Sequence, residues 1–147
     1  MSVLKNLESI LETIEKTAQK AGRNKNEIML LPVVKTVEPQ RIIEAIKAGF
    51  PIIGENRVQE VLKKEEELKN YPHQVHLIGH LQTNKVKDIL GHISCLQSLD
   101  SLKLAEKLEN RLSFLNSDLP VLVEVNTSFE EAKSVINPDY ALEFLEE

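Results

Sequence analysis

Hydrophobic and polar positions alternate along this chain with two different periods. Between Val3 and Ala18 the apolar residues recur every three or four positions, which predicts an amphipathic helix that ends at Gly22. An unbroken apolar run then covers residues 28–34 and is typical of a strand buried on both faces of a parallel sheet. The same alternation continues downstream, with strands predicted at 50–54, 74–79, 93–97 and 120–126, and helices at 39–49, 56–69, 83–90, 100–115 and from Pro138 to the end.

Regular alternation of strands and helices predicts an α/β fold with a parallel sheet and right-handed crossovers. No linker rich in glycine or serine interrupts the pattern, so we expect one domain over residues 1–147. Two closures fit the pattern. An open doubly wound sheet suits about five strands, whereas a whole (β/α)₈ barrel needs roughly 200–250 residues. The pattern by itself leaves both closures open.

Composition and charge narrow the class of protein. The chain is 41% hydrophobic and 28% charged with a net charge of −5, which is typical of globular proteins and argues against a general nucleic-acid binder. It has no apolar run long enough to span a membrane, and Lys5 and Glu8 interrupt any secretory signal. The single cysteine, Cys95, is interpreted as a buried thiol in a cytoplasmic protein. The charged run Lys63–Glu67 is interpreted as a solvated helix face.

Polar side chains follow every predicted strand at the point where the strand ends. Both barrels and doubly wound sheets build their sites at these carboxyl ends. For Asn56, Asn84 and Asp100 the alternative role is that of a helix N-cap. The polar residues at the strand ends are Lys35, Glu55, Asn56, His80, Gln82, Asn84, Ser98, Asp100, Asn126 and Ser128.

Lys35 directly follows the apolar run at 28–34. In an extended chain it shares one side with Leu31 and Val33, which turns it toward the interior of the sheet. An amine in that position can lose its hydration and attack an aldehyde to form a Schiff base. The alternative is a lysine that ends a strand by reaching into water.

Two further groups have alternative roles. His80 lies at the end of its strand, where it could hold a ligand oxygen, transfer a proton or donate a hydrogen bond to a neighbouring loop. His76 and His80 are four residues apart, which does not suit a metal pair on a strand, so we expect no metal site. Glu124 lies in an apolar strand and must be paired or protonated if buried, with Lys35, His80 or a helix lysine as its partner.

Five segments of the chain resemble the pyridoxal 5′-phosphate (PLP) homeostasis protein family, the small single-domain relatives of bacterial alanine racemase. The resemblance covers essentially the whole chain. The matching segments are LPVVKT (31–36), GENRVQE (54–60), HLIGHLQTNKVKDI (76–89), SLDSLKLAEKL (98–108) and VLVEVNTSFEEAKS (121–134).

The resemblance implies a (β/α)₈ barrel that binds PLP as a Schiff base on Lys35. It implies a carrier or regulator of the PLP pool rather than an enzyme. Two other functions stay open, namely a barrel remnant that acts as a scaffold or interaction module, and a Schiff-base aldolase. The residues that match the family's other contacts are Asn56, His80, Ser98 and Asn126 around the cofactor ring, and Lys133 as a secondary contact.

The sequence departs from the family pattern in two respects. Phe129 and Val135 stand where the family favours glycines, and Ala132 where it favours serine. The family's later strands, which carry the phosphate-binding loop and an arginine near the ring nitrogen, have no counterpart in these 147 residues. We therefore expect an incomplete barrel of about five units, the N-terminal portion of the domain, with weak affinity for PLP. Its open sheet edges are expected to favour self-association.

Overall fold

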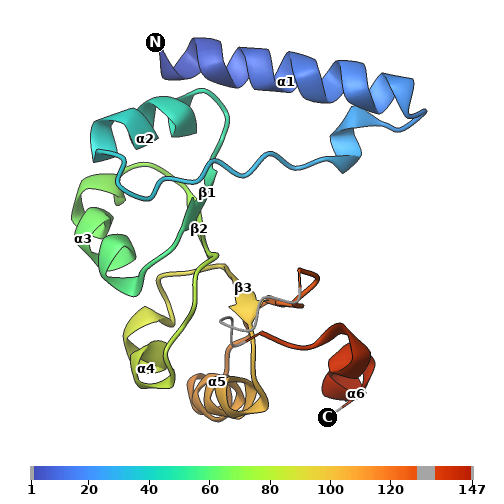
Figure 1. The fold of residues 1–147 in the computed structure, drawn as a ribbon. Helices are drawn as coiled ribbons and strands as arrows, with labels where there is room; N and C mark the ends of the chain where they lie inside the picture. The colour runs from blue at the N-terminus through green and yellow to red at the C-terminus, as the bar shows by residue number, and fades with distance from the viewer. Residues whose placement is uncertain (1, 129–134, 147) are drawn as a thin grey trace.

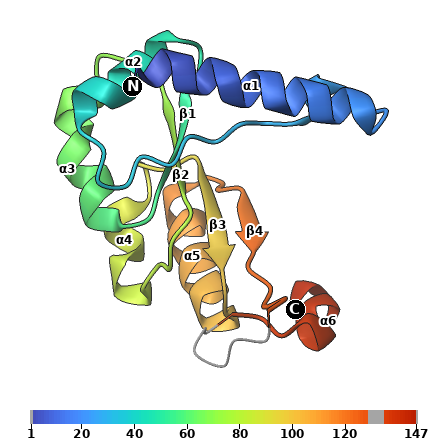
Figure 2. The same cartoon turned by 45° about the horizontal axis from the view of Figure 1, so that its top comes forward.

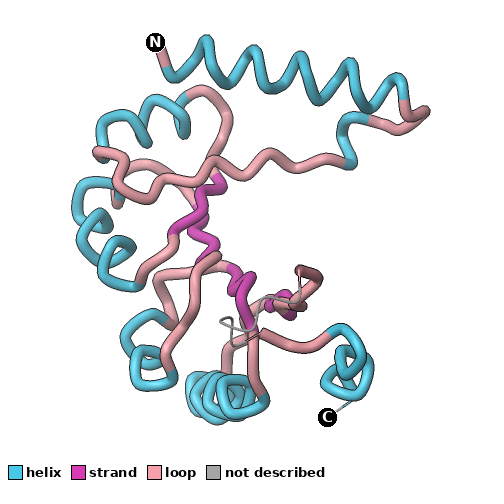
Figure 3. Tube along the Cα trace, viewed as in Figure 1, coloured by secondary structure: helices cyan, strands magenta, loops and turns pink. Residues whose placement is uncertain are grey.

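The computed structural model describes residues 2–128 and 135–146, which form one layer of parallel strands and one layer of helices (Figures 1 and 3). The elements lie close to their predicted bounds, with the first predicted strand as the exception. The strands are β1 (Ile52–Glu55), β2 (Gln74–Leu77), β3 (Cys95–Leu99) and β4 (Val121–Val123). The helices are α1 (Val3–Lys20), α2 (Pro39–Lys47), α3 (Val58–Leu68), α4 (Val86–Ile89), α5 (Leu102–Leu115) and α6 (Ala141–Glu146), with 3₁₀ turns η1 (Lys25–Glu27), η2 (Thr83–Lys85) and η3 (Pro138–Tyr140).

The four strands are parallel and lie in the order β1-β2-β3-β4, the order in which they occur in the sequence. Helices α2, α3, α4 and α5 follow one another around one side of this curved sheet (Figures 1 and 2). A doubly wound sheet reverses its strand order at a switch point, and the described strands show no reversal. The α/β class is therefore confirmed, and the sequential order is consistent with part of a barrel.

The core lies between the sheet and its helices. The side chains of Ile53, Leu77 and Leu96 point from three adjacent strands toward the helices and are almost completely buried. Ile42 of α2 and Leu104 of α5 cover them. Each such side chain stabilises the fold by roughly 1.5–3 kcal/mol relative to an exposed position, so this layer is the main source of stability.

The apolar run at residues 28–34 does not form the predicted strand. Its described contact with the sheet is a single parallel bridge between Val33 and Gly54, with the Val34 amide donating to the Gly54 carbonyl at 2.9 Å. Met29 is 67% exposed and Val33 is 46% exposed, so burial on both faces is the wrong prediction. Lys35 and Val33 do share one side of the segment, as predicted. Both are exposed, whereas Val34 between them is buried. No described strand covers the inner face of this segment.

Two predictions about the chain as a whole can be compared with the fold. Cys95 is a free, buried thiol, as predicted, and burial raises its pKa above the ordinary value for cysteine. Within residues 2–128 and 135–146, no helix has both the length and the apolar character that a membrane crossing demands.

Candidate functional site

Lys35 lies at the corner of a tight turn. The amide of Val37 donates to the carbonyl of Val34 at 3.0 Å, which closes a four-residue turn with Lys35 and Thr36 at its centre. Thr36 has a φ of +59°, a conformation that the third position of a type II turn requires and that a β-branched residue rarely adopts. The Lys35 side chain is exposed, and within the described part of the chain its amine has no hydrogen bond or ion pair. The amine is therefore accessible to a ligand, and no described residue would have to release it first.

Asn56 follows β1 and carries an unsatisfied polar atom. Its side-chain oxygen Oδ1 is buried and has no hydrogen-bond partner among the described residues. Buried polar atoms are nearly always paired, so an orphan of this kind indicates a place for a donor from a ligand or water. A Cβ on Gly79 would lie only 2.2 Å from the Asn56 carbonyl oxygen, so the close approach of the two strand ends requires glycine.

The N-cap role considered for three of the polar residues is wrong. The N-cap of α3 is Arg57 rather than Asn56, and that of α5 is Ser101 rather than Asp100. Asn84 lies inside η2, whose N-cap is Gln82. These three side chains are therefore available for other contacts at the carboxyl end of the sheet.

His80 and Asp100 join the ends of two neighbouring strands. The Nδ1 of His80 lies 2.7 Å from Oδ2 of Asp100, and the Ser101 hydroxyl donates to Oδ1 of the same carboxylate at 3.1 Å. The carboxylate is nearly buried, whereas the imidazole is 61% exposed. An ionised carboxylate only accepts hydrogen bonds, so Nδ1 donates, and Nε2 has no hydrogen-bond partner among the described residues. Of the alternatives for His80, the structure thus shows a hydrogen bond to a neighbouring loop and leaves Nε2 free for a ligand.

Ser98 reaches the site through an irregularity in β3. Leu96 pairs with Val121 and Leu99 with Val123, so β3 has one residue more than β4 over this stretch. Such a bulge re-aims the side chains that follow it. Ser98 is completely buried and its hydroxyl donates to the Gly79 carbonyl at 2.7 Å, which ties β3 to β2 beside Asn56.

The remaining predicted contacts lie further along the chain. Asn126 follows the carboxyl end of β4, and its backbone amide donates to the Ile136 carbonyl at 2.8 Å. Lys133 lies outside the described residues. Glu124 is only half-buried, so the condition for a charged partner is not met, and within the described residues it forms no ion pair with Lys35, His80 or a helix lysine. The physical reason is that β4 ends at Val123 and is an edge strand in the described sheet.

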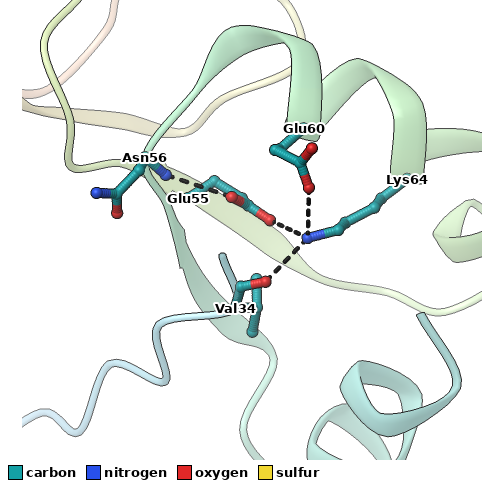
Figure 4. Close-up of polar contacts among 5 residues, drawn as sticks. All are labelled: Val34, Glu55, Asn56, Glu60 and Lys64. Atoms are coloured by element: carbon teal, nitrogen blue, oxygen red, sulfur yellow. Dashed lines mark hydrogen bonds and ion pairs between the residues drawn. The ribbon is translucent and has the colours of Figure 1, made fainter. Parts of the chain in front are cut away.

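Sequence reasoning missed one buried charged cluster. Lys64 was expected on a solvated helix face, but its side chain is only 8% exposed and its Nζ lies 2.6 Å from Oε1 of Glu55, itself 2% exposed (Figure 4). Glu60 contributes a second carboxylate at 3.3 Å. Glu55 therefore points into the helix layer and not toward Lys35. An i, i+4 pattern of Glu60 and Lys64 was the available signal, but it does not distinguish exposed from buried pairs.

His76 lies in β2, four residues before His80, on the side of the sheet that faces away from the helices. The amide nitrogen Nε2 of Gln97 lies 2.8 Å from its Nδ1. Desolvation by burial lowers the pKa of His76 below the ordinary histidine value. No group of three or more potential metal ligands occurs among the described residues.

Taken together, these contacts define a class: a parallel α/β protein in which Asn56, His80, Ser98 and Asp100 lie at the carboxyl ends of the strands. An exposed lysine, Lys35, follows the segment that bridges to β1. No protein-family model matches the chain. Among curated proteins, it is 42% identical to the pyridoxal phosphate homeostasis protein of Aquifex aeolicus over 99% of its own length. It is 37% identical to that of Pasteurella multocida over 97% of its length. The chain is a homologue of the pyridoxal phosphate homeostasis proteins, as its motifs predicted.

Solved structures similar to this chain were also found. A protein of unknown function from Bifidobacterium adolescentis aligns over 97% of the chain with a TM-score of 0.91 and 35% identity. PipY of Synechococcus elongatus aligns in a PLP-free structure with a TM-score of 0.75 over 88% of the chain. It also aligns in a structure with PLP bound, with a TM-score of 0.70 over 86% of the chain, and both PipY structures are 31% identical to the chain.

The chain spans less than two thirds of its relatives. It covers 64% of the Aquifex protein, 62% of the Bifidobacterium chain and 58% of the PLP-bound PipY chain. The curated relatives are named for the homeostasis of PLP.

Proposed function

We propose that this chain binds PLP as a Schiff base on Lys35 and that it takes part in PLP homeostasis as a carrier or regulator rather than as an enzyme. The observation that carries the proposal is the exposed amine of Lys35, which has no polar partner among the described residues, at the carboxyl end of the sheet in a homologue of PLP-bound PipY. When bound, PLP supplies an aldehyde with which a lysine amine condenses.

The residues around this position fit such a group. The orphaned Oδ1 of Asn56 would accept a hydrogen bond from it or from a water beside it. The free Nε2 of His80 would face it, oriented by the Asp100 carboxylate. The Ser98 hydroxyl donates to the Gly79 carbonyl and so stabilises the strand ends that carry Asn56 and His80. We propose Asn126 and Lys133 as further contacts on the basis of the family motifs alone.

The chain is further proposed to be the N-terminal portion of a barrel domain. Sequential parallel strands with helices on one side support this proposal. Leu122 of β4 is 55% exposed and Val121 is 39% exposed, which is unusual for apolar residues on a strand. Copies of the 147-residue chain are therefore proposed to associate through the sheet edge at β4. The alternative function is that of a scaffold or interaction module that does not bind PLP. Such a scaffold would pair through the same sheet edge.

Reduction with borohydride in the presence of PLP tests the proposal directly. We expect an absorption band near the visible edge when PLP is added, and peptide mapping of the reduced protein should find the label on Lys35. Lys35→Ala should lose both signals. Lys63→Ala, which removes an exposed lysine of α3, is the matched control and should retain them. A label on Lys63 and other exposed lysines without one on Lys35 would contradict the proposal.

A further inference from the structure

Lys64 makes three polar contacts in the interior of the helix layer. Its Nζ donates to the Val34 carbonyl at 2.9 Å and lies 2.6 Å from Glu55 and 3.3 Å from Glu60 (Figure 4). Val34 precedes Lys35, and Glu55 precedes Asn56. A single buried ammonium group on α3 thus contacts the chain immediately before two residues of the candidate site.

The contact with Val34 involves the carbonyl that closes the Lys35 turn. That oxygen accepts the Val37 amide at 3.0 Å and the Lys64 ammonium at 2.9 Å, which uses both of its lone pairs. The turn contains Thr36 at a φ of +59°, and such a conformation persists only where the surroundings enforce it. The segment at 28–34 adds only limited support, because it joins the sheet through one bridge with two backbone hydrogen bonds to Gly54, and its residues Ile28, Met29 and Val33 are exposed.

The second contact extends to Asn56. Glu55 Oε1 pairs with Lys64, while its Oε2 accepts a hydrogen bond from the backbone amide of Asn56 at 3.3 Å (Figure 4). In Figure 4 the Asn56 side chain points away from the buried pair. One carboxylate therefore connects the ammonium group to the backbone that presents the unpaired Oδ1 of Asn56.

Stability alone does not account for a buried pair in this position. Removing two charges from water is costly, and apolar residues of similar volume often stabilise a core as well or better. A charged donor, however, can hold a backbone carbonyl in a fixed direction, and a leucine cannot.

We propose that Lys64 is a positioning residue: it fixes the turn that presents Lys35 and, through Glu55, the backbone that presents Asn56. The inference rests on the proposed function in so far as Lys35 is the residue that holds PLP. It goes beyond that function by assigning a role to a residue that does not contact the cofactor site.

Amide hydrogen exchange at Val37 measures the turn without any ligand. Loss of a charged hydrogen-bond donor should accelerate this exchange about tenfold or more in Lys64→Met. The double variant Glu55→Gln/Lys64→Met removes both charges of the most deeply buried pair and therefore guards against misfolding; Glu60, which also loses its partner, has a side chain that is 31% exposed. The double variant still lacks the donor to Val34, so we expect the same acceleration. Amides in the middle of α5 should exchange as in the unmodified chain.

Labelling of Lys35 measures the consequence. At a PLP concentration below saturation, followed by borohydride, both variants should carry about tenfold less label on Lys35. Leu104→Ala is the matched control, because it weakens the core at α5 and leaves the turn intact. At comparable loss of global stability, it should keep the normal Val37 exchange and the normal label.

The outcomes separate the two proposals. Unchanged exchange at Val37 in the double variant, or equal acceleration in Leu104→Ala, would overturn the role of Lys64. Normal labelling of Lys35 in the double variant would overturn it as well. If the unmodified chain carries no label on Lys35, the proposed function fails, and the exchange at Val37 still decides whether Lys64 fixes the turn.

Discussion

The Nδ1 of His80 lies 2.7 Å from the Oδ2 of Asp100, and this contact joins the ends of β2 and β3. Four residues earlier, the Nδ1 of His76 lies 2.8 Å from the amide nitrogen of Gln97. A carboxylate can only accept and an amide nitrogen can only donate. The two imidazoles therefore use the same ring atom in opposite ways, as a donor in His80 and as an acceptor in His76.

Nitrogen NMR of the neutral imidazoles should show this difference. We expect the proton of His80 on Nδ1 and that of His76 on Nε2. Asp100→Asn removes the carboxylate and should shift the His80 population toward the Nε2–H form, which is preferred in the absence of an acceptor at Nδ1, while His76 keeps its signal. The same tautomer for both histidines in the unmodified chain would contradict the geometry.

The lowered pKa of His76 predicts how stability depends on pH. Burial disfavours the charged ring, so the unfolded chain takes up this proton at a higher pH than the folded chain does. The contribution of neutral His76 to the free energy of unfolding is therefore complete above about pH 6.5, the ordinary histidine pKa. It is lost as the pH falls toward the lower pKa of the folded chain. Urea unfolding as a function of pH should show a smaller loss over that window in His76→Gln. A loss equal to that of the unmodified chain would assign the pH dependence to other groups.

Gly79→Ala should destabilise the chain severely. The added Cβ would lie 2.2 Å from the Asn56 carbonyl oxygen, so the ends of β1 and β2 must separate. We expect a loss of about 3 kcal/mol or more in the free energy of unfolding. Gly91→Ala is the control, because its Cβ meets no atom within 4 Å and only the positive φ of +98° opposes it. That strain costs about 1–2 kcal/mol. Equal losses in the two variants would show that the strand ends separate easily.

Association of the 147-residue chain should depend on the edge at β4. The described residues pair β4 only with β3, and Leu122 is 55% exposed. Light scattering over a dilution series should give a mass that rises with concentration, and Leu122→Lys should return it to that of a monomer. Leu142→Lys is the control, since Leu142 is more exposed but lies on α6. A monomer mass at all concentrations in the unmodified chain would refute edge pairing.

The periodicity of the chain determined the local elements and the class of fold. Apolar positions at helical spacing set α1 and α2, and alternating strands and helices required a parallel sheet. Polar residues at the strand ends were predicted to gather on one edge of this sheet. His80 and Ser98 do so, because the carboxyl ends of parallel strands meet there.

Only the tertiary structure decided which side chains are buried and what they contact. The run at 28–34 is apolar enough for a strand buried on both faces, but Ile28, Met29 and Val33 remain exposed and only Val34 is fully buried, because burial on both faces requires a partner on each. Lys64 looks like any other lysine of a charged helix. It is buried because the fold brings the Glu55 carboxylate and the Val34 carbonyl, 9 and 30 residues away in the sequence, within hydrogen-bond distance of its Nζ. Contacts between residues so distant in sequence depend on the packing of whole elements, which local patterns do not encode.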